Sequence, residues 1–397
     1  MSRDPRPART PLFSQPSSAY YLILGSVTIL TALGLVMVLS ASSVTALNES
    51  GNSFAIVLRQ ALFLSIATPL AWLAINLRES LWLPIARTSF VVSAIFLILP
   101  QVSGIGRTVG GNTNWIGIGS FTIQPSEFAK LGLIIWCALR LRVHDAKRAR
   151  GEFSNPALLV LPGVSILLVL ILLGKDLGTA VVVGAIVGGM LFISGIPMRA
   201  FAFFGGLLGA GFAILILASP NRLNRFAAFF DPFSQTNYKG VGWQQAHSIM
   251  GLASGGALGT GLGSSKQKWG NLPEAHTDFI FAVIGEELGL LGTLAVLILF
   301  ALLILAIFRV ALRTPDSFER YATAGVGCWF AVQVLLNIGT VISVMPVVGV
   351  TLPFISYGGS SLLASFIAIG FVLGVLRRDP AIAAEIKEKK AARAARG

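Results

Sequence analysis

Apolar runs long enough to cross a lipid bilayer recur along most of this chain. A membrane-spanning helix needs about 20 mainly apolar residues, and hydrophobic residues make up 54% of the 397 residues while charged residues make up 12%. Together with a mean hydropathy of +0.79, this composition excludes an ordinary soluble domain. We therefore expect an all-α polytopic membrane protein with about ten transmembrane helices. The runs lie at roughly 20–44, 54–76, 87–102, 125–143, 157–173, 177–194, 198–219, 277–312, 319–345 and 354–377.

The positive charge of the chain fits membrane topology better than nucleic-acid binding. The formal net charge is +13, but the basic residues fall in short loops and tails between the apolar runs, which is the pattern that orients membrane proteins. An even number of spans puts both termini on one side, and we predict that this side is the cytoplasm. The basic groups assigned to it are Arg78 with Arg87, the run from Arg140 to Arg150, Arg199, Arg309 with Arg313 and Arg320, and the tail from Arg377.

Two tails and one long loop lie outside the apolar runs. Residues 1–19 are rich in Pro, Ser and Arg and have too little apolar surface to fold, so we expect a disordered cytoplasmic tail. Residues 378–397 form a basic cytoplasmic tail that either rests on anionic headgroups or binds a partner. Between the tails, 20–377 is the transmembrane domain. Its one large extracytoplasmic loop, 220–276, contains two Trp residues and a Gly-rich core, which predicts a structured cap on the membrane surface.

A group of acidic residues stands where one apolar run begins. An ionised side chain inside a membrane span costs several kcal/mol unless it faces protein or water, so such residues are functional hypotheses. The alternative for Asp278 is structural, because an acid in a first helical turn favours the helix dipole. On a straight helix, Glu286 is about 80° around from Asp278 and about 12 Å deeper, so Glu286 and Glu287 are expected to be internal or cytoplasmic-half groups. The stretch is WGNLPEAHTDFIFAVIGEELG, with Glu274, His276, Asp278, Glu286 and Glu287.

Further ionisable residues lie in or beside the spans. Arg59 is in the second run, where it either contacts substrate or extends to the membrane surface. Glu127 and Lys130 are three residues apart at the start of the fourth run, so they share a helix face and can pair, as a structural ion pair or as a substrate site. Because Lys130, Asp176 and Asp278 fall at the same predicted extracytoplasmic boundary, we expect a shared polar cavity.

Two uncharged segments are candidate binding loops. SGGALGTGLGSS at 254–265 is either a flexible loop or a set of backbone N–H groups that binds phosphate. GVTLPFISYGGSS at 349–361 offers hydroxyl groups to a sugar or phosphate, but its composition is also that of an ordinary re-entrant turn. His276 could act as a ligand or proton shuttle, but the three histidines form no HExxH or HxH pattern, so no metal site is predicted from the residues.

Four blocks of the sequence match a known pattern. They are NWIGIGSFTIQPSEFAK, DLGT, GWQQAHSIMGLASGGALGTGLGSSKQKWGNLPEAHTDFIFAVIGEELG and LPFISYGGSS, and they spread over the span region from about Tyr20 to Leu376. With these blocks the chain resembles the SEDS family (shape, elongation, division and sporulation proteins), the membrane peptidoglycan polymerases that include FtsW and RodA. The wording SSKQKWGNLPEAHTDF is closer to the FtsW branch than to the RodA branch.

The resemblance implies a SEDS-type fold and glycosyl transfer at the outer face of the bacterial cytoplasmic membrane, at the division septum. Lipid II, an undecaprenyl pyrophosphate-linked disaccharide-pentapeptide, would be both donor and acceptor, and the product would be a β-1,4 glycan strand. The implied partners are a class B penicillin-binding protein and other division-complex proteins. No cofactor is required by the resemblance; a divalent cation, Mg²⁺ or Mn²⁺, is one alternative for holding the leaving group.

The resemblance also assigns roles to residues. Asp278 matches the essential Asp of the family, and we expect it to act as the general base on the 4-hydroxyl of the acceptor sugar. Inversion at the donor sugar needs only one carboxylate base. Lys130, Arg59 or a divalent cation would then stabilise the pyrophosphate leaving group. The predicted substrate-binding residues are Arg59, Lys130, Glu127, Asp176, Trp115, Ser356 and Gly358.

Two departures from the family pattern concern charge partners. Asn114 stands where many relatives have Arg, so the cationic contact expected there is absent or is supplied by Arg107. Gly174 and Lys175 stand where relatives have Gln or Glu followed by Pro. This second departure leaves both the geometry and the charge partner of Asp176 open.

Other functions remain open from the residues. A lipid II flippase would also place charged groups within spans and use Gly-interrupted segments, a RodA-like polymerase would serve cell elongation, and a non-catalytic scaffold would serve the division complex. The ionisable residues cluster toward one membrane face and no internal repeat is apparent. Both observations favour the polymerase.

Overall fold

Ten long helices make up most of the protein. The computed structural model describes residues 17–109, 112–118, 121–217, 223–224, 228–380, 382 and 385. Within this part of the chain, ten helices have 17 residues or more, and each overlaps one predicted apolar run. They are α1 (Ser18–Ser50), α2 (Ala55–Asn76), α3 (Glu79–Ile98), α4 (Pro125–Ala149), α5 (Pro156–Leu173), α6 (Leu177–Ile193), α7 (Met198–Leu217), α11 (Ile280–Arg313), α12 (Ser317–Val341) and α13 (Gly359–Arg378).

The expected polytopic helical fold is confirmed. Seven of the described helices, α1, α2, α3, α5, α11, α12 and α13, are by themselves long and apolar enough to cross a membrane. The predicted tails at 1–19 and 378–397 lie almost entirely outside the described residues, and so does part of the long loop at 220–276. The tails therefore stay predictions.

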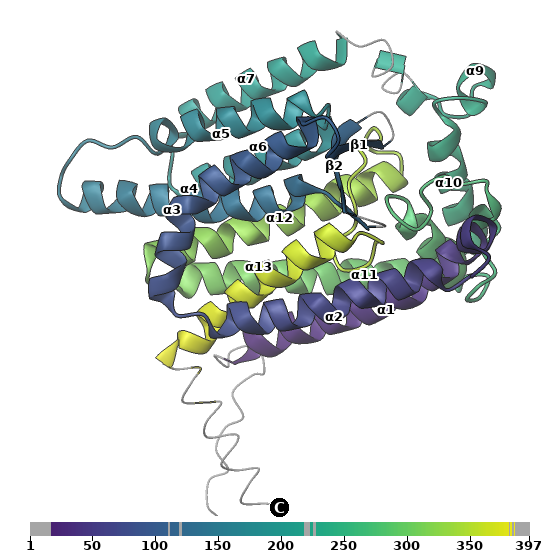
Figure 1. Ribbon diagram of the computed structural model, residues 1–397, viewed down its shortest axis with the longest axis horizontal. Helices are drawn as coiled ribbons and strands as arrows, with labels where there is room; N and C mark the ends of the chain where they lie inside the picture. The colour runs from purple at the N-terminus through teal and green to yellow at the C-terminus, as the bar shows by residue number, and fades with distance from the viewer. Residues whose placement is uncertain are drawn as a thin grey trace, which may run out of the picture.

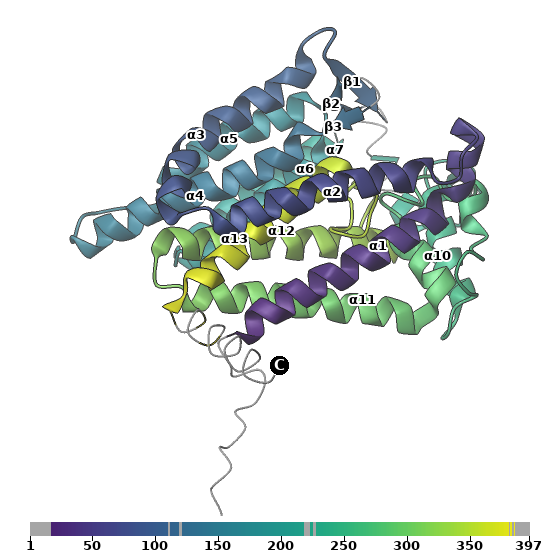
Figure 2. The same ribbon diagram turned by 60° about the horizontal axis from the view of Figure 1, so that its bottom comes forward.

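Helices α12 and α13 form the centre of the helix bundle. The most apolar windows of these two helices are 78% and 89% buried, against 22% for α2. Helix α12 packs against α4, α6 and α11, while α13 packs along α2, as Figures 1 and 2 show. A side chain at Gly370 would collide with the backbone of Ala71, which explains how closely α13 and α2 approach.

A small sheet and several short helices occur at one end of the bundle (Figure 2). Strands β1 (Gly106–Val109), β2 (Asn112–Ile118) and β3 (Phe121–Ile123) pair antiparallel in the order β1-β2-β3, after the 3₁₀ helix η2 (Leu99–Gln101). The all-α expectation missed this sheet. The long loop contains α9 (Gln235–Tyr238), α10 (Trp243–Gly255) and the 3₁₀ helix η3 (Gln267–Trp269), so its described part is structured, as predicted.

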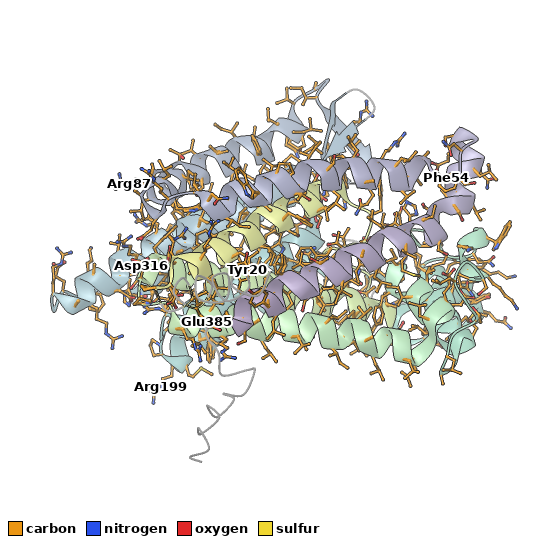
Figure 3. All side chains as sticks on the ribbon, turned by 90° about the horizontal axis from the view of Figure 1, so that it is seen from below. Tyr20, Phe54, Arg87, Arg199, Asp316 and Glu385 are labelled. Atoms are coloured by element: carbon orange, nitrogen blue, oxygen red, sulfur yellow. The ribbon has the colours of Figure 1, made fainter. Side chains whose placement is uncertain are left out.

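Labelled residues mark the two ends of the bundle. Arg87, Arg199 and Asp316 lie at one end, which we call the basic end, and Phe54 lies at the other (Figure 3). The sheet, α9 and α10 share the end of Phe54 (Figures 1 and 2), which we call the site end. The predicted cytoplasmic loops thus converge on one end, and their cytoplasmic location stays a prediction.

Helix α11 is not the continuous span that the sequence predicted. Its backbone is interrupted at Gly289, which has φ 66° and ψ −165°, a conformation open essentially to Gly alone. Residues 280–288 are therefore a short first segment, packed against α10 at the site end. Of the two expected positions for Glu286 and Glu287, the cytoplasmic-half one is wrong, because the segment that carries them packs against α10 and binds residues 265–267 at the site end.

Candidate active site

Asp278 lies directly before α11, and its backbone is held from two sides. Three consecutive carbonyl oxygens in this segment each accept one hydrogen bond. The His276 oxygen accepts from the Tyr357 amide at 2.9 Å, and the Thr277 oxygen accepts from the Ser356 hydroxyl at 2.6 Å. The Asp278 oxygen accepts from Nδ2 of Asn337 at 2.7 Å. The position of Asp278 is thus fixed by α12 and by the segment before α13.

The carboxylate of Asp278, unlike its backbone carbonyl, is not held by hydrogen bonds from the described residues. No described residue donates a hydrogen bond to it, and Oδ2 lies 3.6 Å from where a side chain at the exposed Gly349 would begin. Burial, with the nearby charges of Glu274 and Asp176, raises the pKa of Asp278 from 3.8 to about 7. Burial also lowers the pKa of His276, so this neighbour is a poor source of positive charge. Asp278 can therefore exchange a proton near neutral pH.

Asp176 caps α6 and joins it to the sheet. Its carboxylate accepts hydrogen bonds from the amide and hydroxyl of Thr179 at 2.9 and 2.8 Å and from Nδ2 of Asn114 at 2.6 Å. Gln124 adds a longer contact at 3.3 Å. The amide of Asn114 thus takes the place of a charge partner, while the preceding Lys175 adopts a left-handed φ of 61°. The charge partner of Asp176, which the sequence left open, is thus replaced by neutral hydrogen-bond donors.

Asp176 and Asp278 lie on two sides of one segment. A side chain at Gly178, in the first turn of α6, would collide with the carbonyl of Val348. The next residue, Gly349, is the one beside the Asp278 carboxylate. The two acids are close enough that Asp176 contributes to the raised pKa of Asp278, so the predicted convergence holds for this pair.

Glu127 and Lys130 form the predicted ion pair. The Lys130 ammonium lies 2.8 Å from Glu127 Oε1, donates to Oε1 of Gln333 at 3.1 Å and lies 5.0 Å from the ring centroid of Trp329. Lys130 is only 1% exposed. The ammonium is thus engaged within the protein.

Arg59 is exposed on α2 near the site end, and no described acid pairs with it. Its neighbour Gln60 is buried and binds the segment before α13. Its Nε2 donates to the backbone carbonyl of Ser356 at 3.2 Å, and its Oε1 accepts from the Gly358 amide at 3.3 Å. Trp115 is half-buried on β2, opposite Arg107 in the strand register. The hydroxyl of Ser356 donates to the backbone carbonyl of Thr277. Ser356 and Gly358 therefore contribute to the site by fixing the backbone, with no side-chain group left for substrate.

The end of the Gly-rich loop and the two residues after it bind the carboxylates of Glu286 and Glu287. Glu286 accepts from the amides of Lys266 and Gln267 at 2.9 and 3.4 Å, and Glu287 accepts from the Ser265 amide at 3.2 Å. The Lys268 ammonium lies 3.4 Å from Glu287 Oε1. The predicted internal hydrogen-bonding role of the two acids is confirmed. Within 254–265, the amide of Ser265 is bound by Glu287, and the amides of Gly259, Thr260 and Gly261 are bound by carbonyl oxygens, so these four amides are not available to a phosphate.

Comparisons with known proteins identify the family. The FtsW/RodA/SpoVE family, described as cell cycle proteins, matches residues 20–380. The chain belongs to this family. A probable peptidoglycan glycosyltransferase FtsW of Coxiella burnetii is 39% identical over 352 residues, covering 87% of this chain and 93% of the relative. Stage V sporulation protein E of Bacillus subtilis is 36% identical, covering 88% and 94%.

Solved structures of the FtsW/RodA/SpoVE family share the fold. A chain of a peptidoglycan synthase complex, described as coordinating polymerization and crosslinking, matches with a TM-score of 0.71 and 29% identity over 89% of this chain and 96% of that chain. The rod shape determining protein RodA of Thermus thermophilus matches with a TM-score of 0.64 and 29% identity over 90% and 96%.

An apolar groove opens between α2, α3 and α4. Its volume is about 430 Å³, and only Thr88, Ser89 and Ser93 add hydroxyl groups to its lining. In a family member that uses a lipid-linked substrate, an acyl or prenyl chain must approach from the bilayer. The apolar lining includes Leu70, Leu73, Ile85, Val92, Phe96, Phe128 and Leu131.

Sequence reasoning missed two amides of the site, Gln333 and Asn337. Both are buried on α12, four residues apart in the run QVLLN, and they project from one helix face. The signal was present, since two amides at this spacing in an apolar helix are unusual. Neither side chain is charged, so neither stood out as an ionisable group in a membrane span.

Proposed function

We propose that this chain is a peptidoglycan glycosyltransferase that polymerises lipid II into β-1,4 glycan strands at the outer face of the bacterial cytoplasmic membrane, with Asp278 as the general base. The observation that carries the proposal is the Asp278 carboxylate, which is held through its backbone, receives no donor from the described residues and has a pKa of about 7. The peptidoglycan glycosyltransferase names of the relatives support it.

The reaction follows from this geometry. The Asp278 carboxylate takes the proton of the 4-hydroxyl on the acceptor GlcNAc as the oxygen attacks C1 of the donor sugar. The bond from C1 to the pyrophosphate oxygen breaks, and the electron pair leaves with undecaprenyl pyrophosphate. A base is most effective when its pKa lies near the operating pH, which a pKa of about 7 satisfies. One carboxylate is sufficient because the linkage inverts from α to β.

The leaving pyrophosphate needs positive charge. Because the Lys130 ammonium is engaged by Glu127 and Gln333, we assign this contact to Arg59, which is exposed at the site end and has no acid partner among the described residues. A divalent cation would supply the same charge. No group of three or more His, Cys, Asp or Glu side chains among the described residues could hold one, so such a cation would depend on substrate oxygens for ligands, and no step above passes through it.

The remaining predicted substrate contacts keep distinct places in this proposal. Asp176 accepts from protein donors through its carboxylate, and Glu127 accepts from Lys130 through Oε1 and has no partner at its buried Oε2; both act on substrate by shaping the site. Trp115 is half-buried on the sheet, where its ring can stack on a sugar. The apolar groove beside α2 and α3 is where the undecaprenyl chain would lie. Arg59→Ala should slow polymerisation; a wild-type rate in this variant would contradict the assignment of Arg59 to the pyrophosphate leaving group.

The setting of the reaction is also proposed. The peptidoglycan synthase complex that shares the fold supports a partner that crosslinks the new strand, and a class B penicillin-binding protein has that chemistry. The FtsW names of the relatives support work at the division septum with other division-complex proteins. The basic end then faces the cytoplasm with both termini, and Asp278 faces outward.

The test is polymerisation of labelled lipid II by the purified protein with its penicillin-binding partner, resolved by glycan length on a gel. We expect glycan from the wild type and from Asp231→Asn, an exposed acid in the same loop, and none from Asp278→Asn. Glycan from Asp278→Asn at the wild-type rate would remove Asp278 as the base. No glycan from any folded sample, together with transbilayer movement of lipid II in vesicles, would establish the flippase alternative instead.

A further inference from the structure

Three polar side chains on α12 connect the two charged parts of the site. Trp329, Gln333 and Asn337 are four residues apart, so they form one row along the helix. Gln333 accepts from the Lys130 ammonium at 3.1 Å and donates from Nε2 to the Thr351 carbonyl at 2.9 Å. One turn later, Asn337 reaches the segment of Asp278.

Asn337 makes two equal contacts with one amide group. Its Nδ2 donates to the carbonyl of Asp278 at 2.7 Å and to the carbonyl of Val350 at 2.7 Å. The side chain is only 2% exposed, and its Oδ1 is buried with no hydrogen-bond partner. Leaving a buried acceptor unpaired is destabilising, so packing alone does not explain an amide here. What Asn337 contributes is its two donors.

The two carbonyls belong to the two walls of the site. Asp278 is the proposed base, and Val350 follows Gly349, where an added side chain would begin 3.6 Å from the Asp278 carboxylate. A donor aimed at the carboxylate itself would stabilise the charged form and lower its pKa. Asn337 instead holds the backbone on both sides, and no described residue donates to the carboxylate.

We propose that Asn337 is a positioning residue that sets the distance between the Asp278 base and the 348–350 segment, with Ser356 fixing the adjacent carbonyl of Thr277. The inference rests on the proposed function, since it gives Asn337 a role through Asp278. A displacement of the base by about 1 Å is sufficient to cost about a hundredfold in rate. Gln333 does the equivalent for Thr351 and ties the same wall to Lys130.

The test substitutes Asn337 and measures lipid II polymerisation together with lipid II binding. Asn337→Leu removes both donors without adding charge. We expect kcat to fall by at least about tenfold while KM stays within about twofold, and each mole of protein should still bind the wild-type amount of lipid II. That binding stoichiometry counts folded sites, so a variant that merely misfolds would lose binding and kcat by the same factor.

The matched control is Thr340→Val. Thr340 lies on the same helix, and its hydroxyl donates at 3.1 Å to the carbonyl of Pro346, two residues before the 348–350 segment, and not to the backbone of Asp278. We expect it to keep wild-type kcat. Equal losses in Thr340→Val and Asn337→Leu would overturn the proposal, because the effect would then belong to the segment and not to the base.

Asn337→Asp keeps the shape if the Leu variant does not fold. Its carboxylate lacks the donors and adds a third negative group beside Glu274 and Asp176, which already face Asp278. We expect the same loss of kcat and a shift of the acid limb of the pH profile to higher pH. Wild-type kcat and an unmoved limb would overturn the proposal.

Failure of this inference is distinct from failure of the proposed function. If Asp278→Asn is inactive while Asn337→Leu works like the wild type, only the positioning role is lost. If Asp278→Asn polymerises lipid II normally, the base assignment itself is wrong. We also expect Ser356→Ala to lower kcat and Ser356→Thr to keep it closer to the wild-type value, because Thr retains the hydroxyl that donates to the Thr277 carbonyl.

Discussion

A carboxyl group that is partly buried and lies near other acids resists ionisation, and Asp278 is such a group. Its pKa of about 7 has burial as the largest cause, then Glu274, then Asp176. Its carboxylate receives no hydrogen bond from the described residues, so no donor in that part of the chain offsets this effect. The same environment that makes Asp278 a base near neutral pH therefore makes its charged form costly to the fold.

This cost predicts that Asp278→Asn stabilises the protein. A pKa raised from 3.8 to about 7 on folding means that the wild type loses stability as pH rises from the lower value to the higher one. We expect Asp278→Asn to melt at a higher temperature than the wild type above pH 7 and to lose that advantage as pH falls toward 4. Thermal unfolding in detergent across this range is the measurement. A lower melting temperature at high pH would contradict the pKa assignment.

The ion pair of Glu127 and Lys130 gives a second prediction. Removing one partner of a buried pair leaves an uncompensated charge and costs about 3–5 kcal/mol, whereas replacing both can be neutral. Both groups are buried and 2.8 Å apart, so we expect Lys130→Met alone to lower the melting temperature strongly. The double variant Glu127→Leu/Lys130→Met should recover it.

Activity of the same double variant decides the role of the pair. Glycan synthesis near the wild-type level means that the pair is structural. A folded double variant with no activity would mean that Lys130 contacts the pyrophosphate leaving group.

Sequence patterns located the charged residues of the site better than its neutral ones. Spacing predicted the pairing of Glu127 with Lys130, and the density of acids singled out Asp278. Nothing in the spacing showed that Asn114 is the partner of Asp176, because that contact joins residues 62 positions apart. The role of Asn337 depends on a contact across 59 positions, which no local pattern contains.

At the scale of the elements, the break in α11 separates the site from the membrane span. The Leu290 and Leu291 amides bind the carbonyls of Gly256 and Ala257 at 2.9 and 3.2 Å, so the Gly-rich loop replaces the helical partners that the break removes. Hydropathy predicted the long helices because a bilayer demands apolar length. It could not predict the break at Gly289, because that break depends on a loop packed against it.

Gly289→Ala tests this arrangement. A side chain there would meet the carbonyl of Ala257 at 2.7 Å and collide with the amide of Gly259, and the backbone would be strained by its positive φ. We expect loss of folded protein, or of at least about 3 kcal/mol of stability. Gly205→Ala on α7 is the control, since nothing lies within 4 Å of its added methyl. Normal yield and melting of Gly289→Ala would mean that the kink is not required.

At the scale of the whole molecule, the proposal requires the site end to face outward. Lys175 is exposed beside Asp176, and Arg148 is exposed near the end of α4, at the opposite, basic end. In intact cells a membrane-impermeant thiol reagent should label Lys175→Cys and spare Arg148→Cys. Both should react once the membrane is permeabilised, while the native Cys137 and Cys328 stay unlabelled because they are buried. Labelling of Arg148→Cys alone in intact cells would mean that the protein has the opposite orientation in the membrane.

The most direct test of the central claim is the initial rate of lipid II polymerisation as a function of pH, for the wild type with its penicillin-binding partner. If Asp278 is the base, the rate should rise with pH, with a midpoint near 7, and Asp278→Asn should show no such rise. A wild-type midpoint near the ordinary carboxyl value of 3.8, or the same rising profile in Asp278→Asn, would contradict the assignment of Asp278 as the general base.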